Sequence, residues 1–104
     1  MNHTNMFLTA DKYKMGEIYY KIIPKHWGKG YATEIAKALI NYGFNDLKLH
    51  RIEAGAAVQN LKSLRVLEKI GMTKEGIRRK ILPIRGEWVD GHQYAIIEDD
   101  LRDY

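Results

Sequence analysis

The stretch PKHWGKGYATE, residues Pro24–Glu34, decides how the rest of this chain is organised. An apolar run at 18–23 precedes it, and residues 32–44 follow it with apolar side chains at helical spacing. This order predicts a strand, a tight turn that contains two glycines, and the N-terminus of a helix. Unpaired backbone N–H groups and the helix dipole favour an anion at such a turn. The stretch therefore predicts a binding site for a pyrophosphate group.

The composition is typical of one small folded domain. The chain has 104 residues, of which 45% are hydrophobic and 29% are charged. We expect a single domain over residues 1–104 with its core in 16–97. No apolar run reaches the roughly 20 residues that a membrane span needs, and residues 1–10 do not resemble a signal peptide. The absence of cysteine excludes disulfides, thiolate metal sites and cysteine nucleophiles, and it favours a cytoplasmic location.

The net charge of +4 comes from 17 basic and 13 acidic residues. A basic balance is compatible with nucleic acid or with a phosphorylated small molecule as a partner. The positive residues are dispersed, and we interpret their densest cluster, Arg78-Arg79-Lys80, as a solvated surface. The dispersed charge disfavours nucleic acid as a partner.

The hydrophobic pattern predicts strands that alternate with helices and end in a hairpin. Two strands joined through a helix imply a right-handed crossover and a parallel pair, and the closing hairpin makes the sheet mixed. The expected fold class is therefore α/β (or α+β). The expected elements are strands at 6–8, 16–23, 50–58, 72–84 and 88–97, and helices at 32–44 and 60–70.

Several local features of these elements are also predicted. The run 52–58 is expected to be a strand buried on both faces. Asn60 would cap the second helix, and Gly71 would supply the left-handed residue at its end. Gly76 would interrupt the strand that follows. The stripe buried by the first helix is expected to be Ala32, Ile35, Ala36, Leu39 and Tyr42.

Two common nucleotide motifs do not fit the glycine turn. The dinucleotide fingerprint needs glycines at its first, third and sixth positions, and Thr33 stands at the sixth. A P-loop needs Gly-Lys followed by Ser or Thr, but Gly30 follows Lys29. A Gly-Lys-Gly triplet by itself is weak evidence, because most such triplets are ordinary turns.

The residues around the triplet resemble a known family. Residues 27–34, WGKGYATE, resemble the acetyl-CoA loop of the GNAT superfamily of N-acetyltransferases. Residues 60–72, NLKSLRVLEKIGM, are similar to the Asn-x-x-Ser-x-x-x-Leu-Glu-Lys-x-Gly-Phe helix of its ribosomal-protein-alanine N-acetyltransferase branch. Residues 85–90, RGEWVD, followed by Tyr94, match the closing hairpin of that branch more loosely. Together these stretches lie within residues 16–97.

The resemblance implies a GNAT-like mixed sheet flanked by helices. It also implies that the usual N-terminal strand and two helices are lacking, because only about fifteen residues precede Gly16. That segment normally forms part of the acceptor pocket and one flank of the core. We therefore expect self-association, as a homodimer or another homo-oligomer, or a partner chain.

The resemblance further implies acetyl-CoA as cosubstrate. Its pyrophosphate would bind backbone N–H groups of residues 28–33, and its arm would lie between the strands at 18–23 and 52–58. No pair among the histidines has metal-ligand spacing, so we predict no metal. The residues expected to bind acetyl-CoA are Ile22, Ile23, Trp27, Gly28, Lys29, Gly30, Tyr31, Ala32, Thr33, Asn60 and Ser63.

The implied activity is transfer of an acetyl group to a primary amine, which attacks the thioester directly. The acceptor would be a protein N-terminus, a polyamine or a small-molecule amine. The reaction needs a base, an oxyanion donor and an acid for the leaving thiolate. The oxyanion donor would be a backbone N–H near Ile22. Leu67 occupies the position of the tyrosine acid found in many relatives, and the branch offers Ser63 instead.

The base is the least defined part of the expected site. The carboxylate that relatives carry before the hairpin turn aligns with Leu82. Glu17 is our candidate, and Glu87 and Asp90 are others; each would otherwise be a solvated or turn-capping carboxylate. The alternative function is a catalytically impaired CoA-binding fragment or module that needs a partner chain.

Overall fold

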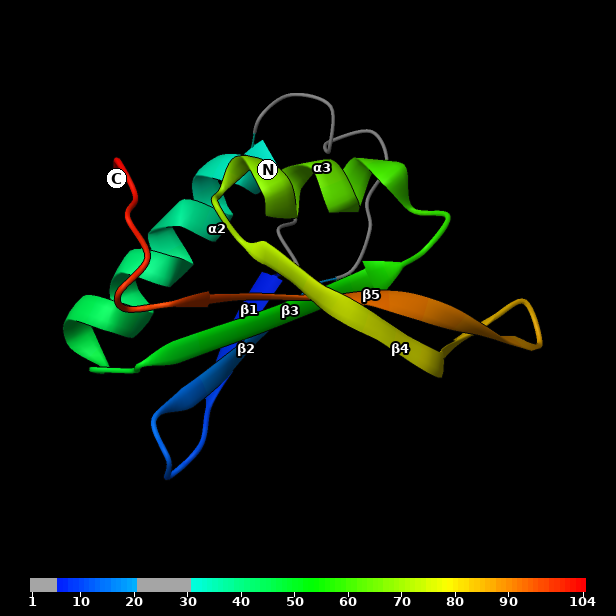
Figure 1. Ribbon diagram of the computed structural model, residues 1–104, viewed down its shortest axis with the longest axis horizontal. Helices are drawn as coiled ribbons and strands as arrows, with labels where there is room; N and C mark the ends of the chain where they lie inside the picture. Colours follow the sequence, from blue (N-terminus) through cyan, green and yellow to red (C-terminus); the bar gives the residue numbers. More distant parts are fainter. Residues whose placement is uncertain (1–5, 21–30) are drawn as a thin grey trace.

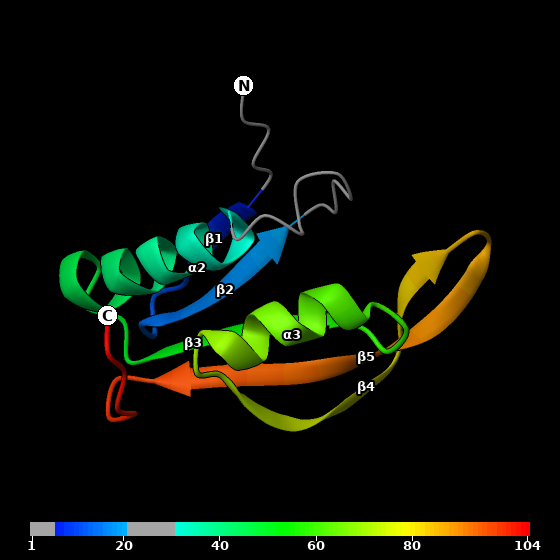
Figure 2. The same ribbon diagram turned by 90° about the horizontal axis from the view of Figure 1, so that it is seen from above.

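The computed structural model describes residues 6–20 and 31–104, which form one sheet with helices packed on one of its faces (Figure 1, Figure 2). None of the described helices is long and apolar enough to cross a membrane. The strands are β1 (Met6–Ala10), β2 (Met15–Tyr20), β3 (Arg51–Ala57), β4 (Thr73–Ile84) and β5 (Glu87–Ile97). The helices are α2 (Tyr31–Asn41), the π-helical turn η1 (Tyr42–Asp46) and α3 (Leu61–Lys69).

The described sheet is mixed, as the sequence predicts. Its five strands have the order β1-β2-β3-β5-β4. The pair β2–β3, which α2 connects, is parallel, and the other pairs are antiparallel. The predicted class, a mixed α/β sheet with helices, is therefore confirmed.

The parallel pair at the centre of the sheet separates before its strands end. The pairing runs from Met15–Arg51 to Ile18–Ala54. Beyond that point β2 continues to Tyr20 and β3 continues to Ala57. Figure 2 shows the two strands diverging toward this end. A gap thus opens inside the sheet, at the carboxyl ends of two parallel strands.

The buried stripe of α2 differs from the predicted one. Ala32, Ala36 and Ile40 are buried at a spacing of four residues, and Phe44 continues the stripe through η1. Tyr42, which was expected on this stripe, is 50% exposed. The wider turn of a π-helix explains the difference, because it keeps Phe44 in line with Ile40 and directs Tyr42 outward.

The prediction that residues 52–58 are buried on both faces is wrong. Ile52, Ala54 and Ala56 are buried against the helices, whereas Arg51 and Glu53 alternate with them and are only half-buried. The physical reason is that the described helices cover one face of the sheet, so the other face of β3 carries charged side chains.

Both predicted ends of α3 are confirmed. The side-chain oxygen of Asn60 accepts a hydrogen bond from the Ser63 backbone N–H at 3.3 Å, which satisfies one of the free donors of the first turn. Gly71 follows the helix with φ of 90°, a conformation that glycine adopts without strain. The helix buries Leu64 and Leu67 against the sheet.

Candidate active site

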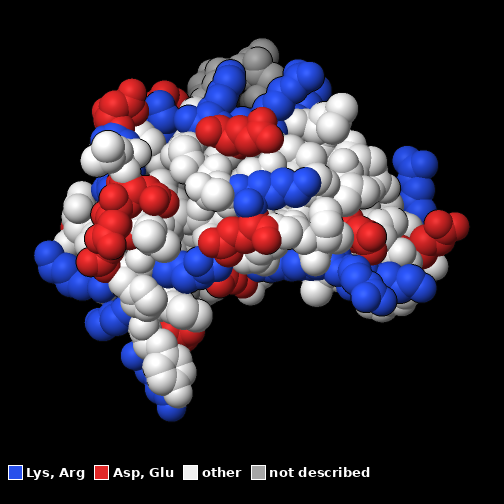
Figure 3. All heavy atoms as spheres, viewed as in Figure 1, with Lys and Arg blue, Asp and Glu red and all other residues white. Residues whose placement is uncertain are grey.

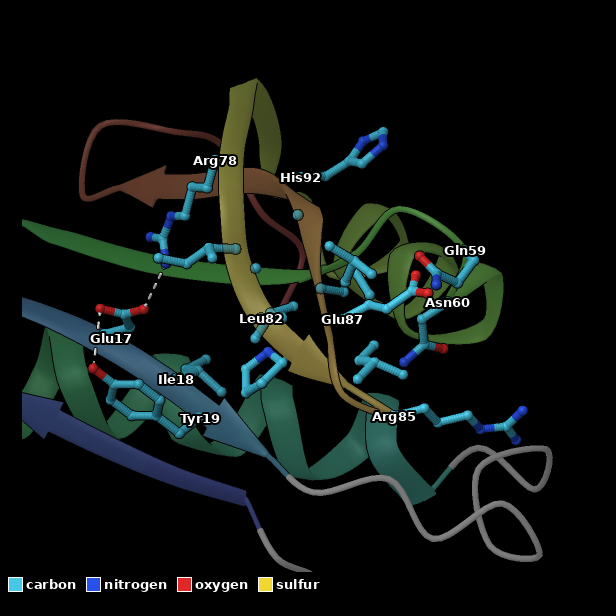
Figure 4. A pocket seen from close by; sticks show the side chains of 18 residues that line it. Glu17, Ile18, Tyr19, Gln59, Asn60, Arg78, Leu82, Arg85, Glu87 and His92 are labelled. Carbon is cyan, nitrogen blue, oxygen red and sulfur yellow. Dashed lines mark hydrogen bonds and ion pairs between the residues drawn. The ribbon is translucent and has the colours of Figure 1, made fainter.

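A cavity of about 1130 Å³ lies between the diverging ends of β2 and β3 and the β4–β5 hairpin (Figure 4). Ile18 and Tyr19 line it from β2, and Ala56 and Ala57 line it from β3. The side chains of β3 are small here, which allows a ligand to approach the backbone closely. The gap between the parallel strands therefore opens directly into the cavity.

The start of α3 forms a second wall of this cavity. Asn60 lines it, so the residue that caps the helix also faces the space beside the strands. Ser63 is 1% exposed, and its hydroxyl finds no hydrogen-bond partner among the described residues. The structure thus brings Asn60 and Ser63 together at one helix end. Leu67 is buried in the core.

Glu17 is one of two candidate bases that the structure places at the cavity, the other being Glu87. One carboxylate oxygen accepts a hydrogen bond from Nη1 of Arg78 at 3.1 Å, and the other accepts one from the Tyr19 hydroxyl at 3.3 Å (Figure 4). The negative charge of Glu17, and then partial burial, raises the pKa of Tyr19 above its ordinary value of 10.0. Glu17 is therefore an ordered carboxylate with a neutral phenol beside it.

Arg78 was not identified as a site residue from the sequence, and the interpretation of residues 78–80 as a solvated surface is wrong for it. Its side chain is only 28% exposed, and it lines the cavity together with Glu17. The strand period carried a signal, because Gly76 and Arg78 lie on the same, less exposed side of β4. Its acidic partners lie on other strands, so neighbouring residues do not reveal the pairing.

The remaining candidate residues take different positions. Glu87 lines the cavity near the hairpin turn, and Leu82 presents an apolar side chain to it. Asp90 accepts a hydrogen bond from the Lys80 backbone N–H at 2.8 Å. This contact fits the alternative role expected for Asp90, a carboxylate that caps the backbone instead of acting as a base. The imidazole of His92 points away from Glu17 in Figure 4.

The glycine turn lies mostly beyond what the structure describes. The expected start of a helix after it is confirmed, since α2 begins at Tyr31. Ala32 is buried and Thr33 is half-buried in the first turn of this helix. The other residues predicted to bind acetyl-CoA from this stretch lie outside the described residues; they are Ile22, Ile23, Trp27, Gly28, Lys29 and Gly30.

The charge pattern of the surface is mixed. Figure 3 shows acidic and basic side chains interspersed on the face drawn there, without an extended area of one sign. Within residues 6–20 and 31–104, no group of three or more acidic or histidine side chains is arranged to hold a metal ion.

Comparison with known proteins gives one family. The acetyltransferase (GNAT) domain family matches residues 4–73. Among curated relatives, the uncharacterized N-acetyltransferase YnaD of Bacillus subtilis is 44% identical over 84 residues, which are 81% of this chain and 49% of that protein. The probable N-acetyltransferase YjcK of the same organism is 49% identical over 83 residues (80% and 46%). The spermidine N(1)-acetyltransferase of Vibrio cholerae is 30% identical over 86 residues (83% and 50%).

Solved structures of acetyltransferases are also similar to this chain. An acetyltransferase of the GNAT family from Bacillus anthracis superposes with a TM-score of 0.81 at 41% identity, over 93% of this chain and 59% of that one. The ribosomal-protein-S5-alanine acetyltransferase from Vibrio fischeri superposes with a TM-score of 0.79 at 32% identity (92% and 52%). The chain spans about half the length of the curated relatives it matches.

Proposed function

This chain belongs to the GNAT family of acetyltransferases, and from that premise we propose that it transfers an acetyl group from acetyl-CoA to a primary amine. The observation that carries the proposal is the gap between the parallel strands β2 and β3. Their pairing ends at Ile18–Ala54, and the gap leads into a cavity beside Asn60. An extended chain fits such a gap, because it can hydrogen-bond to strand backbone as an added strand does.

The site would bind the two ends of acetyl-CoA with different elements. The pantetheine arm would lie along the end of β2, with Asn60 beside it. The pyrophosphate would bind the backbone N–H groups of residues 28–33 at the N-terminus of α2, where the helix dipole favours an anion. Acetyl-CoA supplies a thioester whose C–S bond is replaced by a C–N bond to the amine, with CoA thiol as the second product.

The chain would supply the proton transfers. Glu17 would accept a proton from the ammonium group of the acceptor, which leaves a neutral amine able to attack. Its position at the cavity and its two ordered donors support this role. The hydroxyl of Ser63 would donate a hydrogen bond to the departing sulfur, and its lack of another partner among the described residues supports this role.

The acceptor is proposed to be cationic before it reacts. The cavity lining carries the carboxylates of Glu17 and Glu87 besides Arg78 and Arg85, and a carboxylate favours an ammonium group. Polyamines, protein N-termini and small-molecule amines all fit this chemistry. Two similar proteins, a spermidine acetyltransferase and a ribosomal-protein-alanine acetyltransferase, support the first two classes. We also propose the ribosomal-protein-alanine branch, because residues 60–72 resemble its helix motif, and a cytoplasmic location, because the sequence contains no cysteine.

The test combines binding with product detection. Titration calorimetry with acetyl-CoA measures binding, and release of free CoA thiol with spermidine, N-terminal alanine peptides or simple amines measures transfer. The variant Gly30→Asp, which places a charge and a side chain in the glycine turn, should abolish binding and leave the circular dichroism spectrum unchanged. Asn45→Asp is a matched control, because it adds the same charge at an exposed position beyond the far end of α2.

The outcomes separate the two functions that the sequence left open. Thiol release that depends on an added amine supports an N-acetyltransferase. Tight binding of acetyl-CoA without thiol release would contradict transfer and indicate the alternative, a CoA-binding module that needs a partner chain. If Gly30→Asp binds acetyl-CoA as the unmodified chain does, the pyrophosphate assignment is wrong.

We also propose that the protein self-associates as a homodimer. Large apolar side chains are exposed on the described part of the chain, including Ile77 (49%), Ile81 (45%) and Trp88 (62%) on β4 and β5. Exposed apolar groups of this size favour burial against another surface. Light scattering of purified protein measures the mass, and a monomer at micromolar concentration would contradict the proposal.

A further inference from the structure

A chain of alternating charges crosses the face of the sheet that the described helices leave open. Arg51 binds Glu75 through Nη1 at 3.1 Å, and its Nε donates to Glu53 at 2.9 Å. Arg78 connects Glu53, through Nη2 at 3.5 Å, with Glu17, through Nη1 at 3.1 Å. Three carboxylates and two guanidinium groups therefore form one series that ends at the cavity.

Arg78 reaches farther across the sheet than Arg51, the other arginine of this series. It starts on β4, and its Nε donates a hydrogen bond to the side-chain oxygen of Gln93 on β5. The guanidinium then passes over Gly55 of β3 to reach Glu17 of β2. A Cβ at Gly55 would lie 3.8 Å from Nη1 and 3.9 Å from Cζ, so a side chain longer than a methyl group would take the place of the guanidinium. Glycine thus leaves a path across β3 for this single side chain.

The shape of β4 directs Arg78 toward this path. The pairing of β4 with β5 shifts between Arg78 and Leu82, where three residues of β4 stand opposite one residue of β5, and we refer to this irregularity as the bulge. Lys80 has a φ of 48° within the bulge, and its backbone N–H is held by the carboxylate of Asp90. Bulges beside active sites commonly re-aim a side chain. Here Arg78 before the bulge and Leu82 after it both line the cavity.

We propose that Arg78 is a positioning residue for acetyl transfer, which holds the Glu17 carboxylate at the cavity. The inference rests on the proposed function and adds to it a residue that does not itself touch the acceptor. Arg78 binds one carboxylate oxygen of Glu17, and Tyr19 donates to the other. The carboxylate is therefore fixed from two sides, in one orientation, where a base must meet the proton it removes.

A purely structural role for Arg78 is the competing explanation. Ion pairs with partly exposed partners contribute little to stability. Arg51 offers a matched control for that contribution, because it also pairs with Glu53, but its ion pairs within the described part of the chain do not reach Glu17. Replacing either arginine by methionine removes one positive charge and two ion pairs.

The experiment first compares three arginine variants of the full chain in the amine-dependent thiol assay. We expect Arg78→Met to lower kcat about tenfold, as a share of the ~10²–10⁴-fold that a positioned base contributes. The dissociation constant for acetyl-CoA should stay the same. Arg51→Met should keep kcat within about twofold, since Glu17 keeps both of its donors. Arg78→Lys should restore part of the loss, because an ammonium group can still bind one carboxylate oxygen.

A double variant decides whether Arg78 acts through Glu17. Glu17→Gln removes the base, so adding Arg78→Met to it should cause no further loss of kcat. Losses that multiply would show that the two residues act separately, and that result would overturn the proposal. Equal losses in Arg78→Met and Arg51→Met would overturn it too.

Crystal structures of the two methionine variants provide a measurement that does not need turnover. The Glu17 carboxylate should leave its position in Arg78→Met and keep it in Arg51→Met. If the unmodified chain transfers no acetyl group, the proposed function fails, and these structures still decide whether Arg78 positions Glu17. An unmoved carboxylate in Arg78→Met would overturn the inference by itself.

Discussion

Replacing Ser63 by alanine should make the protein more stable while it lowers acetyl transfer. Ser63 is 1% exposed, and its hydroxyl has no hydrogen-bond partner within the described part of the chain. Burial of such a hydroxyl costs about 1–3 kcal/mol, because water no longer binds it. Alanine removes this cost, and it also has a higher helix propensity than serine by about 0.5 kcal/mol.

The expected gain in the free energy of unfolding is about 1–2 kcal/mol after the small void left by the oxygen is taken into account. For a chain of this size, 1 kcal/mol corresponds to a rise in Tm of about 4–8 °C. Asn60→Ala at the same helix end should have the opposite sign. This substitution removes the side-chain oxygen that accepts a hydrogen bond from the Ser63 backbone N–H, which should lower the free energy of unfolding by about 1 kcal/mol.

Urea denaturation followed by circular dichroism measures both free energies. The same preparations in the thiol assay should show that Ser63→Ala lowers kcat more than it weakens acetyl-CoA binding. A loss of stability of 1 kcal/mol or more (about fivefold in the unfolding equilibrium) would show that the hydroxyl has a partner in the free protein, and that result would refute the reasoning. Full turnover in Ser63→Ala would remove the hydroxyl from the reaction.

Two further predictions concern stability. Gly55→Ala should cost about 1–3 kcal/mol in urea denaturation, because a Cβ there would lie 2.9 Å from the backbone carbonyl oxygen of His92; an unchanged midpoint would contradict this packing. Stability should also fall above pH 10. Burial and the Glu68 carboxylate raise the pKa of Tyr94 above 10.0 in the folded state. As the pH rises, the unfolded chain therefore loses the Tyr94 proton before the folded chain does, which favours unfolding. A plot of Tm against pH should fall less steeply for Tyr94→Phe than for the unmodified chain, and identical slopes would show that Tyr94 does not contribute.

Local signals in the sequence predicted the elements well. The Asn60 cap, the end of α3 at Gly71 and the turn at Arg85–Gly86 each depend on a few neighbouring residues, and all three are observed. The burial of individual faces was predicted less well. Tyr42 and the charged face of β3 were misassigned, because a π-helical turn and the side of the sheet that helices cover are consequences of packing.

The candidate site likewise has one part that depends on neighbouring residues and one part that depends on contacts between distant strands. Residues 27–34 and 60–72 carry motifs whose spacing is set along the chain, and the family that they predict is confirmed. The acetyl-CoA half of the site stays a prediction. The contact between Glu17 and Arg78 joins residues 61 positions apart. It exists because the order β2-β3-β5-β4 places their strands in one sheet and because Gly55 leaves space between them. By itself the sequence determined the family and the secondary structure, whereas only the tertiary structure decided which carboxylate meets which guanidinium, since that pairing depends on contacts between distant strands.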